Sequence, residues 1–251
     1  MTFPWQLHIG IADIPYHVVF ETAGIFLGFR YFLYLRAKQD DAIATTNRLW
    51  IIIGAIFGAV VGSRLLGGFE NPQRMLEASN VFLHFYQNTT IVGGLLGGLI
   101  GVELAKKLIG EKKSSGVLFT YPLILAIMIG RIGCFSMGVY EDTFVTETSS
   151  LFGMDLGDGL LRHPVSLYEI VYLLMLWLFI MTTGSKYDLA EGGRFKIFMI
   201  LYLVFRLLLD YIKPHYTFWF GLSSIQIACA AGLIYYSYFI INPRKIFATY
   251  A

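Results

Sequence analysis

Long apolar runs dominate this sequence, and they restrict the possible folds more than any other feature. A helix needs about 20 apolar residues to cross the hydrocarbon core of a bilayer, because each residue adds only about 1.5 Å of length. Runs close to that length lie at residues 18–35, 49–66, 91–109, 117–135, 165–183, 195–212 and 222–241. The sequence therefore predicts an all-α integral membrane protein with about seven transmembrane helices.

The composition agrees with a membrane protein and argues against several other classes. Hydrophobic residues make up 56% of the chain and charged residues 14%, with a mean hydropathy of +0.63. A net charge of +2 without a block of Lys and Arg argues against a nucleic-acid partner. The two cysteines, Cys134 and Cys229, lie in or beside apolar runs without metal-ligand spacing, so we expect neither a disulfide framework nor a cofactor.

Lysine and arginine are distributed unevenly among the connections between the predicted spans. The first, third and fifth connections and the C-terminal tail carry 12 of the 19, whereas the N-terminal stretch and the other connections carry three. Positive residues concentrate on the cytoplasmic side, so we expect the N-terminus outside and the C-terminus in the cytoplasm. We further expect a single transmembrane domain over residues 1–251, with extracytoplasmic loops at 68–89 and 136–163 that could carry a substrate platform or lid.

One arginine, Arg131, lies between Gly130 and Gly133 at the end of an apolar run and just before the longest polar loop. A charged side chain at the end of a membrane helix is costly unless it faces a protein interior, a partner or a polar ligand. The guanidinium fork matches an oxyanion in a bidentate manner, which favours a binding role. The alternative is an arginine that only extends its head to the lipid headgroups.

Three arginines share a similar predicted depth in the membrane. Counted from the inner ends of their helices at about 1.5 Å per residue, Arg64 lies about 24 Å, Arg131 about 22 Å and Arg206 about 18 Å along the span. Other ionisable residues lie at the outer ends of the spans, namely Glu21, His163 and Glu169. This convergence on one leaflet predicts a polar cavity that opens to the outer face.

Two charged clusters each allow a structural and a functional interpretation. His163 precedes Pro164 at the entry of the fifth predicted helix, where a histidine either binds backbone groups or accepts a proton from a substrate. Arg206, Asp210 and Lys213 follow at i, i+4 and i+7, which places them on one helical face. They form either a buried salt bridge or a pair of cations that holds an anion.

Glycines recur at four-residue spacing in several of the predicted spans. Such series allow helix backbones to approach closely, so we interpret most of them as packing sites. Those beside Arg64 and Arg131 could instead make room for a lipid headgroup. The series consist of Gly24, Gly28, Gly54, Gly58, Gly62, Gly93, Gly97 and Gly101.

Together these motifs resemble the prolipoprotein diacylglyceryl transferase family. The resemblance extends over nearly the whole chain, and its segments occur in order. They are Gly62-Ser63-Arg64, Gly93-Gly94-Leu95-Leu96-Gly97, Gly130-Arg131-Ile132-Gly133-Cys134-Phe135, Arg162-His163-Pro164, Leu167-Tyr168-Glu169, and Arg206 with Asp210 and Lys213. The segments around Arg131 and from Arg162 to Glu169 are specific, whereas the glycine series alone would be weak evidence.

The resemblance implies a multi-pass enzyme of the bacterial inner membrane, with its active site toward the periplasmic leaflet. Such an enzyme moves the diacylglyceryl group of phosphatidylglycerol, a membrane lipid, to the lipobox cysteine of a prolipoprotein signal peptide and releases glycerol phosphate. By resemblance, Arg131 and Arg206 would hold the phosphate, Asp210 would orient Arg206, and His163 and Glu169 would shape the outer mouth. Further expected substrate contacts are Arg64, Gly93, Gly94, Gly130, Gly133, Tyr168, Glu141, Tyr16 and His17.

The sequence departs from the family pattern where a proton acceptor is expected. The family histidine before Gly-Gly-Leu is Val92 here, the asparagine after the arginine motif is Cys134, and the carboxylate that follows arrives only at Glu141. Attack by a thiol requires loss of its proton. His17, His163 or Glu141 could accept it, or the chain could be a divergent paralogue with another acceptor.

Two other classes of protein share some of these features. A phospholipid-binding or transport membrane protein without transferase activity would keep the arginines and lose the base. A rhomboid-type protease is a weaker alternative, because Gly221-Leu222-Ser223 resembles a nucleophile motif but no histidine follows it on the last helix.

Overall fold

The structure, a computed structural model, describes residues 3–9, 12–39, 41–140, 146–213, 216–218 and 221–247. Its α-helices are α1 (Tyr16–Lys38), α2 (Thr45–Gly68), α3 (Pro72–Glu77), α4 (Val81–Gln87), α5 (Ile91–Ile109), α6 (Thr120–Met137), α7 (Val165–Lys186), α8 (Gly193–Leu209), α9 (Ser224–Tyr235) and α10 (Ser237–Ile241). The strands β1 (Gln6–Ile9) and β2 (Ala12–Pro15) form one antiparallel hairpin, and β3 (Met154–Asp155) and β4 (Leu161–Arg162) form another. Short 3-10 turns are η1 (Gly138–Tyr140), η2 (Asp210–Ile212) and η4 (Pro243–Ile246).

Each of the predicted apolar runs overlaps a helix. Among the described residues, α1, α2, α6 and α7 are long and apolar enough to cross a membrane. The helix α5 contains three charged residues, and α8 and α9 have only 17 and 12 residues. The prediction of an all-α membrane protein is confirmed, whereas the number of crossings and the orientation stay predictions.

The described residues cluster into two compact units, which we describe separately. The first unit contains Met1–Asp40, Gly116–Asp188 and Tyr211–Pro214, and the second contains Asp41–Ser115, Leu189–Asp210 and His215–Ala251. The expectation of a single transmembrane domain over residues 1–251 stays a prediction.

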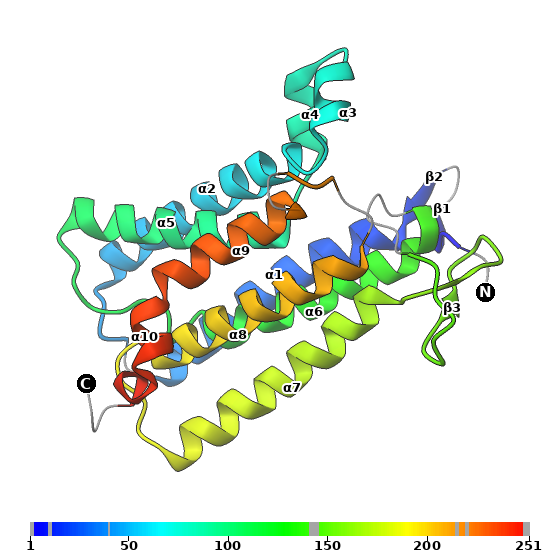
Figure 1. Ribbon diagram of the computed structural model, residues 1–251. Coiled ribbons are helices and arrows are strands. Elements are labelled where there is room, and N and C mark those ends of the chain that lie inside the picture. The colour runs from blue at the N-terminus through cyan, green and yellow to red at the C-terminus, as the bar shows by residue number, and fades with distance from the viewer. Residues whose placement is uncertain are drawn as a thin grey trace. The chain divides into compact units, whose positions relative to one another are not determined.

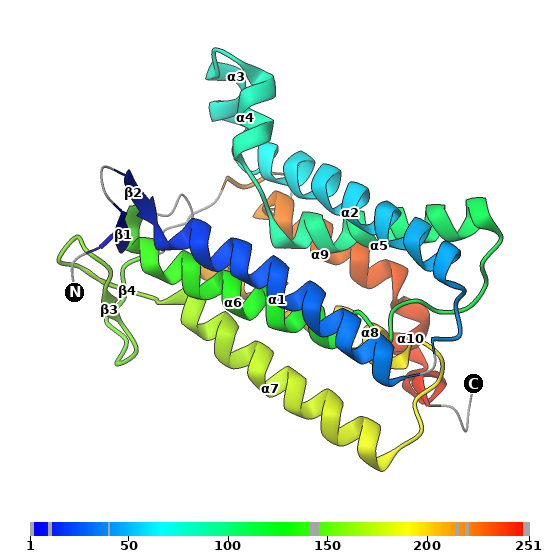
Figure 2. The ribbon, with the colours of Figure 1, turned by 180° about the vertical axis from the view of Figure 1, so that it is seen from behind.

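In the first unit, α1 lies along α6 (Figure 2). Glycines bring the two backbones close, because a Cβ atom on Gly24 would fall 2.8 Å from the carbonyl oxygen of Ala126. The N-terminal hairpin is bound to the end of α6, where the Trp5 amide donates to the Ser136 carbonyl at 2.9 Å. The Trp5 ring also contacts Phe135 edge to face. The N-terminal stretch, expected outside the membrane, therefore contains a hairpin fixed to the helix that carries Arg131.

In the second unit, α2 and α5 pack through their glycine series (Figure 1). A Cβ atom on Gly58 would fall 2.2 Å from the carbonyl oxygen of Gly97, and one on Gly62 would fall 2.4 Å from that of Gly93. Any larger residue would force the helices apart. The packing interpretation of these glycines is confirmed.

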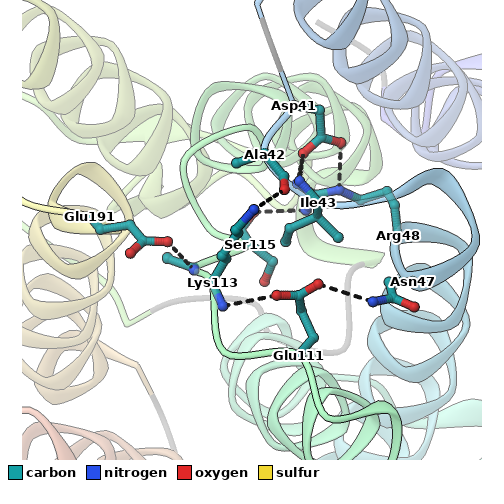
Figure 3. Close-up of polar contacts among 10 residues, drawn as sticks. Asp41, Ala42, Ile43, Asn47, Arg48, Glu111, Lys113, Ser115 and Glu191 are labelled. Carbon is teal, nitrogen blue, oxygen red and sulfur yellow. Dashed lines mark hydrogen bonds and ion pairs between the residues drawn. The ribbon is translucent and has the colours of Figure 1, made fainter.

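A polar cluster joins three connections of the second unit that the sequence places on the cytoplasmic side (Figure 3). Arg48, counted above as a connection charge, lies inside α2 and is only 2% exposed. It donates from Nε and Nη2 to Asp41 and from Nη1 to the Ser115 carbonyl. Arg48 therefore joins the connection before α2 to the connection after α5. A separate bond, from the Ser114 amide to Glu191, joins the connection after α5 to the one before α8.

The same cluster stabilises a carboxylate in the connection after α5. Asn47 donates to Glu111 Oε2 at 3.0 Å, and the Lys113 amide donates to Oε1 at 3.1 Å. These bonds lower the pKa of Glu111 below its ordinary value of 4.5, with the Asn47 bond as the largest cause. The Lys113 ammonium also donates to the Ala42 carbonyl at 2.6 Å.

Candidate functional site

The first unit has a buried ion pair between α6 and α7. Arg131 Nε lies 2.9 Å from Glu169 Oε2, and the Glu169 side chain is completely buried. Arg131 is 9% exposed, and its Nη1 lies 3.3 Å from Cys134 Sγ. A buried charge needs such a partner, since the loss of one member leaves the other desolvated and uncompensated. Glu169, expected to shape an outer mouth, is thus an ion-pair partner of Arg131.

His163 lies just before α7, as the sequence predicts. Its Nδ1 is 3.1 Å from Tyr168 Oη, so the two predicted site residues contact each other. The His163 carbonyl accepts from the Val165 amide at 2.9 Å, which stabilises the first turn of the helix. His163 therefore has both a backbone role at the helix start and a side-chain contact with Tyr168.

At the start of α1, Tyr16 and His17 lie beside the N-terminal hairpin and α6. The Tyr16 amide donates to the Trp5 carbonyl at 3.1 Å. His17 Nε2 is 3.7 Å from Glu21 Oε2, one turn farther along α1. A Cβ atom on Gly133 would fall 3.0 Å from the His17 carbonyl oxygen, so Gly133 allows the close contact of α1 with α6.

Gly130 differs from Gly133, because a Cβ atom there would meet no described atom within 4 Å. Packing in the described part of the chain therefore does not require glycine at this position. The observation is compatible with space beside Arg131 for a ligand.

The second unit contains the other predicted pair, Arg206 and Asp210, which are 3% and 2% exposed. Ser223 is the N-cap of α9, and its hydroxyl donates to Asp210 Oδ2. Gln226 completes a capping box with Ser223 and donates to the Leu207 carbonyl at 3.3 Å. The start of α9 is therefore tied to the end of α8 at the carboxylate expected to orient Arg206.

Arg206, Asp210 and Lys213 were predicted to share one face of an α-helix, and the structure differs because only Arg206 lies in α8. The helix α8 ends at Leu209, and Asp210 begins the 3-10 turn η2. Lys213 lies beyond this turn. A periodicity of 3.6 residues no longer applies once the chain leaves the α-helix.

Three more of the predicted site residues, Gly93, Gly94 and Arg64, lie on α2 and α5, the two helices that pack through their glycines. Gly93 packs against Gly62, whereas Gly94 has only ordinary contacts, the nearest being Ser63 Cβ at 3.7 Å from a built Cβ atom. Arg64 donates from Nη1 to the Tyr86 carbonyl, and its guanidinium carbon lies 4.3 Å from the Tyr86 ring centroid.

Two residues bear on the missing proton acceptor. Val92, at the position of the family histidine, is completely buried in α5. Glu141 lies outside the described residues, so its predicted role is untested. No group of three or more His, Cys, Asp or Glu side chains that could hold a metal occurs in the described part of the chain.

The loop before α7 is stabilised by two carboxylates near β3 and β4. Asp155 Oδ1 accepts from the amides of Gly157 and Gly159 at 2.8 and 3.0 Å, and these bonds lower the pKa of Asp155. Asp158 accepts from Arg162 Nε at 2.8 Å, which lowers the pKa of Asp158 as well. Arg162, part of a motif used above, is thus paired within its own loop.

These arrangements provide two buried arginines, Arg131 and Arg206, on two separate units. Each unit also contains a buried carboxylate. Glu169 pairs with Arg131, and Asp210 accepts a hydrogen bond from Ser223, the N-cap of α9. Fixed guanidinium groups in a low-dielectric environment are suited to binding an oxyanion such as a phosphate. Sequence reasoning missed the role of Ser223, although the spacing Ser-x-x-Gln from Ser223 to Gln226 is the signature of a capping box.

Comparison with known proteins extends over both units. A sequence profile of the family described as prolipoprotein diacylglyceryl transferase matches residues 4–242. The chain is similar to a phosphatidylglycerol--prolipoprotein diacylglyceryl transferase from Campylobacter hominis, with 29% identity over 218 residues, 79% of this chain and 74% of the relative. Proteins of the same name from Wolbachia pipientis subsp. Culex pipiens and Cupriavidus metallidurans are 27% and 25% identical. These matches cover 89% and 92% of this chain and 88% and 87% of the relatives.

Proposed function

Since the chain belongs to the prolipoprotein diacylglyceryl transferase family, we propose that it transfers the diacylglyceryl group of phosphatidylglycerol to the lipobox cysteine of a prolipoprotein signal peptide. The cysteine sulfur forms a bond to the glyceryl carbon as the carbon–oxygen bond to the phosphate breaks. Glycerol phosphate leaves, and the thiol proton passes to a base. The single observation that carries the proposal is the family match along nearly the whole chain, which includes both buried arginines.

The chemistry assigns the arginines to the leaving phosphate. Charge grows on the phosphate oxygens as the bond to carbon breaks, and preorganised donors stabilise that charge. Glu169 holds Arg131 at Nε, while the neighbour of Nη1 is the Cys134 sulfur. Sulfur is a weak acceptor, so a phosphate oxygen can replace it at Nη1. Arg206 has the same role in the second unit, with Asp210 and Ser223 as positioning residues.

The proton acceptor is His163 in this proposal. Its contact with the Tyr168 hydroxyl fixes the ring, which is what a general base requires. His17, beside Glu21, and Glu141 are the alternatives. His163→Gln is expected to lose most of the transfer rate and His17→Gln less of it. If His163→Gln remains fully active, the base lies elsewhere and Glu141 is the next residue to change.

The proposal also includes the location of the reaction and its partners. The protein is a multi-pass protein of the bacterial inner membrane, with the site toward the periplasmic leaflet where signal peptides emerge. The partners are phosphatidylglycerol and the prolipoprotein, and neither a cofactor nor a nucleic acid takes part. A cysteine introduced at Ser150, in the loop before α7, is expected to react with an impermeant thiol reagent from the periplasmic side. Labelling from the cytoplasmic side alone would contradict this orientation.

The transfer itself can be tested with purified protein in phosphatidylglycerol nanodiscs and a synthetic lipobox peptide. Mass spectrometry is expected to find one diacylglyceryl group on the cysteine, with release of one glycerol phosphate per peptide. A matched peptide with serine in place of the lipobox cysteine should stay unmodified. Binding of phosphatidylglycerol without any transfer would favour the alternative, a phospholipid-binding or transport protein, for which the buried Val92 is the supporting observation.

A further inference from the structure

The loop before α7, in the first unit, contains an arch of residues 148–154 that carries two exposed apolar side chains. Leu151 is fully exposed, and Phe152 is 72% exposed. Their neighbours Leu160 and Leu161 in the same loop are 42% and 52% exposed. An apolar patch of this kind, outside the long apolar helices, marks a surface that meets a partner.

The arch is held in one conformation by its own hydrogen bonds. The Gly153 amide donates to the Ser150 carbonyl at 2.9 Å, and the Phe152 amide donates to the Ser150 hydroxyl at 3.3 Å. The Ser150 amide donates to Thr148 Oγ1 at 3.1 Å. The first of these bonds closes a turn with Leu151 and Phe152 at its two central positions, so both side chains stand at the tip.

The strand pairing determines the direction in which the arch runs. On one side of β4, Glu147 pairs with Arg162, and the Thr148 amide donates to the Leu161 carbonyl one residue farther from α7. On the other side of β4, Met154 pairs again with Arg162. Between Thr148 and Met154 the chain therefore turns back toward the end of β4 that leads into α7. Figures 1 and 2 show this loop, marked by β3 and β4, beside the start of α7.

The start of α7 lies near the lipid headgroups. The helix is long and apolar enough to cross a membrane, and its first large apolar side chain of high exposure is Val171, about 9 Å along the helix from Val165. The headgroup region outside the hydrocarbon core is about 5–7 Å thick on each side. A Cβ atom on Gly153 in the arch would fall 3.2 Å from Leu161 Cβ, and the chain from Leu161 to Val165 spans at most about 14 Å. The tip of the arch is therefore within reach of the membrane surface.

We propose that the arch inserts Leu151 and Phe152 into the membrane surface beside α7 and anchors the loop there. The loop at residues 146–163 contains three carboxylates and one arginine, so an anionic headgroup does not supply the attraction. Transfer of the two apolar side chains out of water supplies it, as for other interfacial anchors. A convex tip fits a lipid surface, whereas peptides bind in grooves or along strand edges. The anchor keeps His163, which follows β4, at the membrane surface.

This contact differs from the binding of the proposed substrate. It requires neither an anionic headgroup nor turnover, because apolar side chains enter any fluid bilayer of neutral lipid. A chain without transferase activity would still insert the arch, and an active transferase could lack the anchor. The readout below is therefore lipid labelling in the absence of phosphatidylglycerol, which can fail or succeed independently of diacylglyceryl transfer.

Photolabelling in nanodiscs tests the proposal. The discs contain only phosphatidylcholine, with a trace of the same lipid that carries a diazirine on one acyl chain, and labelled positions are mapped by mass spectrometry. Labels are expected on Leu151 and Phe152 and on residues 171–181 of α7, which serve as the internal reference for a folded protein in the bilayer. The turn at residues 157–159 belongs to the same loop but has no apolar side chain. It should carry about tenfold less label than the arch, because nothing draws it into the bilayer.

A pair of variants tests the role of the two side chains. Leu151→Ser combined with Phe152→Ser should lower labelling of the arch by about tenfold relative to α7, because the arch no longer gains from leaving water. The matched control is Tyr140→Ser, which removes an exposed aromatic side chain of the same unit outside the arch and should leave that ratio unchanged. Equal labelling of the arch and of residues 157–159, equal loss in both variants, labelling of the arch only after phosphatidylglycerol is added, or loss of its label when an apolar signal peptide is added would each overturn the proposal.

Discussion

Arg48 and Arg131 are both buried beside a carboxylate, yet the two regions use the guanidinium differently. At Arg48, Nε and Nη2 donate to the two oxygens of Asp41, and Nη1 donates to the Ser115 carbonyl. All three nitrogens therefore have oxygen acceptors from the protein. Such a bidentate pair with an additional backbone acceptor indicates a structural role.

At Arg131, by contrast, one carboxylate oxygen lies at Nε, and the neighbour of Nη1 is a sulfur. The contact with Glu169 fixes the direction of the guanidinium. Burial and charge alone therefore do not identify a site residue. At Nη1 the two arginines have different neighbours, the Ser115 carbonyl oxygen for Arg48 and the Cys134 sulfur for Arg131.

The largest effect is expected for Glu169→Gln. Removal of the carboxylate leaves Arg131 buried without its compensating charge, which costs about 3–5 kcal/mol of unfolding free energy. The same change frees the guanidinium from its fixed direction, so the transfer rate should fall by about 100-fold. Unfolding in denaturant and transfer to a lipobox peptide measure the two losses. Full activity in a destabilised variant would show that the pair is structural, like that of Arg48.

Asp41→Asn is the matched change in the other region and should give an effect of a single kind. Arg48 would be left buried without its compensating charge, which should cost about 3–5 kcal/mol of unfolding free energy. The rate per folded molecule should stay within about threefold of that of the unchanged protein, less than 1 kcal/mol of activation free energy. A large loss of rate without a loss of stability would contradict the structural role of the pair of Asp41 and Arg48.

Ser223→Ala tests the positioning role that we assign to the start of α9. Asp210 would lose a hydroxyl donor in a buried site, which costs about 1–3 kcal/mol. We expect a rate loss of about tenfold, equivalent to 1.4 kcal/mol, with little change in KM for the peptide. Ser223→Thr keeps the hydroxyl and should restore the rate. Failure of threonine to restore it would indicate a packing defect instead.

The smallest effect concerns pH in the region of Arg48. The pKa of Glu111 is lowered in the folded state, so its contribution to stability is complete above the ordinary value of 4.5 and is lost as the pH falls through the lower folded value. The difference in Tm between the unchanged protein and Glu111→Gln should therefore persist from pH 7 to pH 5 and disappear at lower pH. A difference that vanished above pH 5 would contradict the assignment of the Asn47 bond as its cause.

The sequence predicts the long helices well because the ends of the apolar runs lie within about four residues of the ends of these helices. The glycine spacing also predicts how α2 and α5 pack. The two hairpins are not predicted, since strands of two to four residues are too short to show a period. The helices α3 and α4 are missed as well, although Asn71 and Asn80 stand at their N-caps and Pro72 follows the first of these.

The candidate site is predicted as a set of residues rather than as a set of contacts. Arg131 and Glu169 are both expected, but they lie on different helices, and no local spacing indicates that they pair. Gly133 is expected to bind substrate, and its closest contact is instead with the backbone of α1 at His17. Ser223 has a local signal in Gln226, but its contact with Asp210 depends on how α8 and α9 pack.

The most direct test of this account compares Arg131→Lys with Arg48→Lys in one nanodisc preparation, with the transfer rate and Tm measured on the same samples. Lysine keeps the charge but loses the fork of donors. We predict that Arg131→Lys lowers the rate by about 100-fold or more, as for the loss of an oxyanion donor, with a small change in Tm. Arg48→Lys should lower Tm while the rate per folded molecule stays within about threefold of the unchanged protein. Near-normal transfer by Arg131→Lys, or equal loss in both variants, would contradict the assignment of Arg131 to the phosphate.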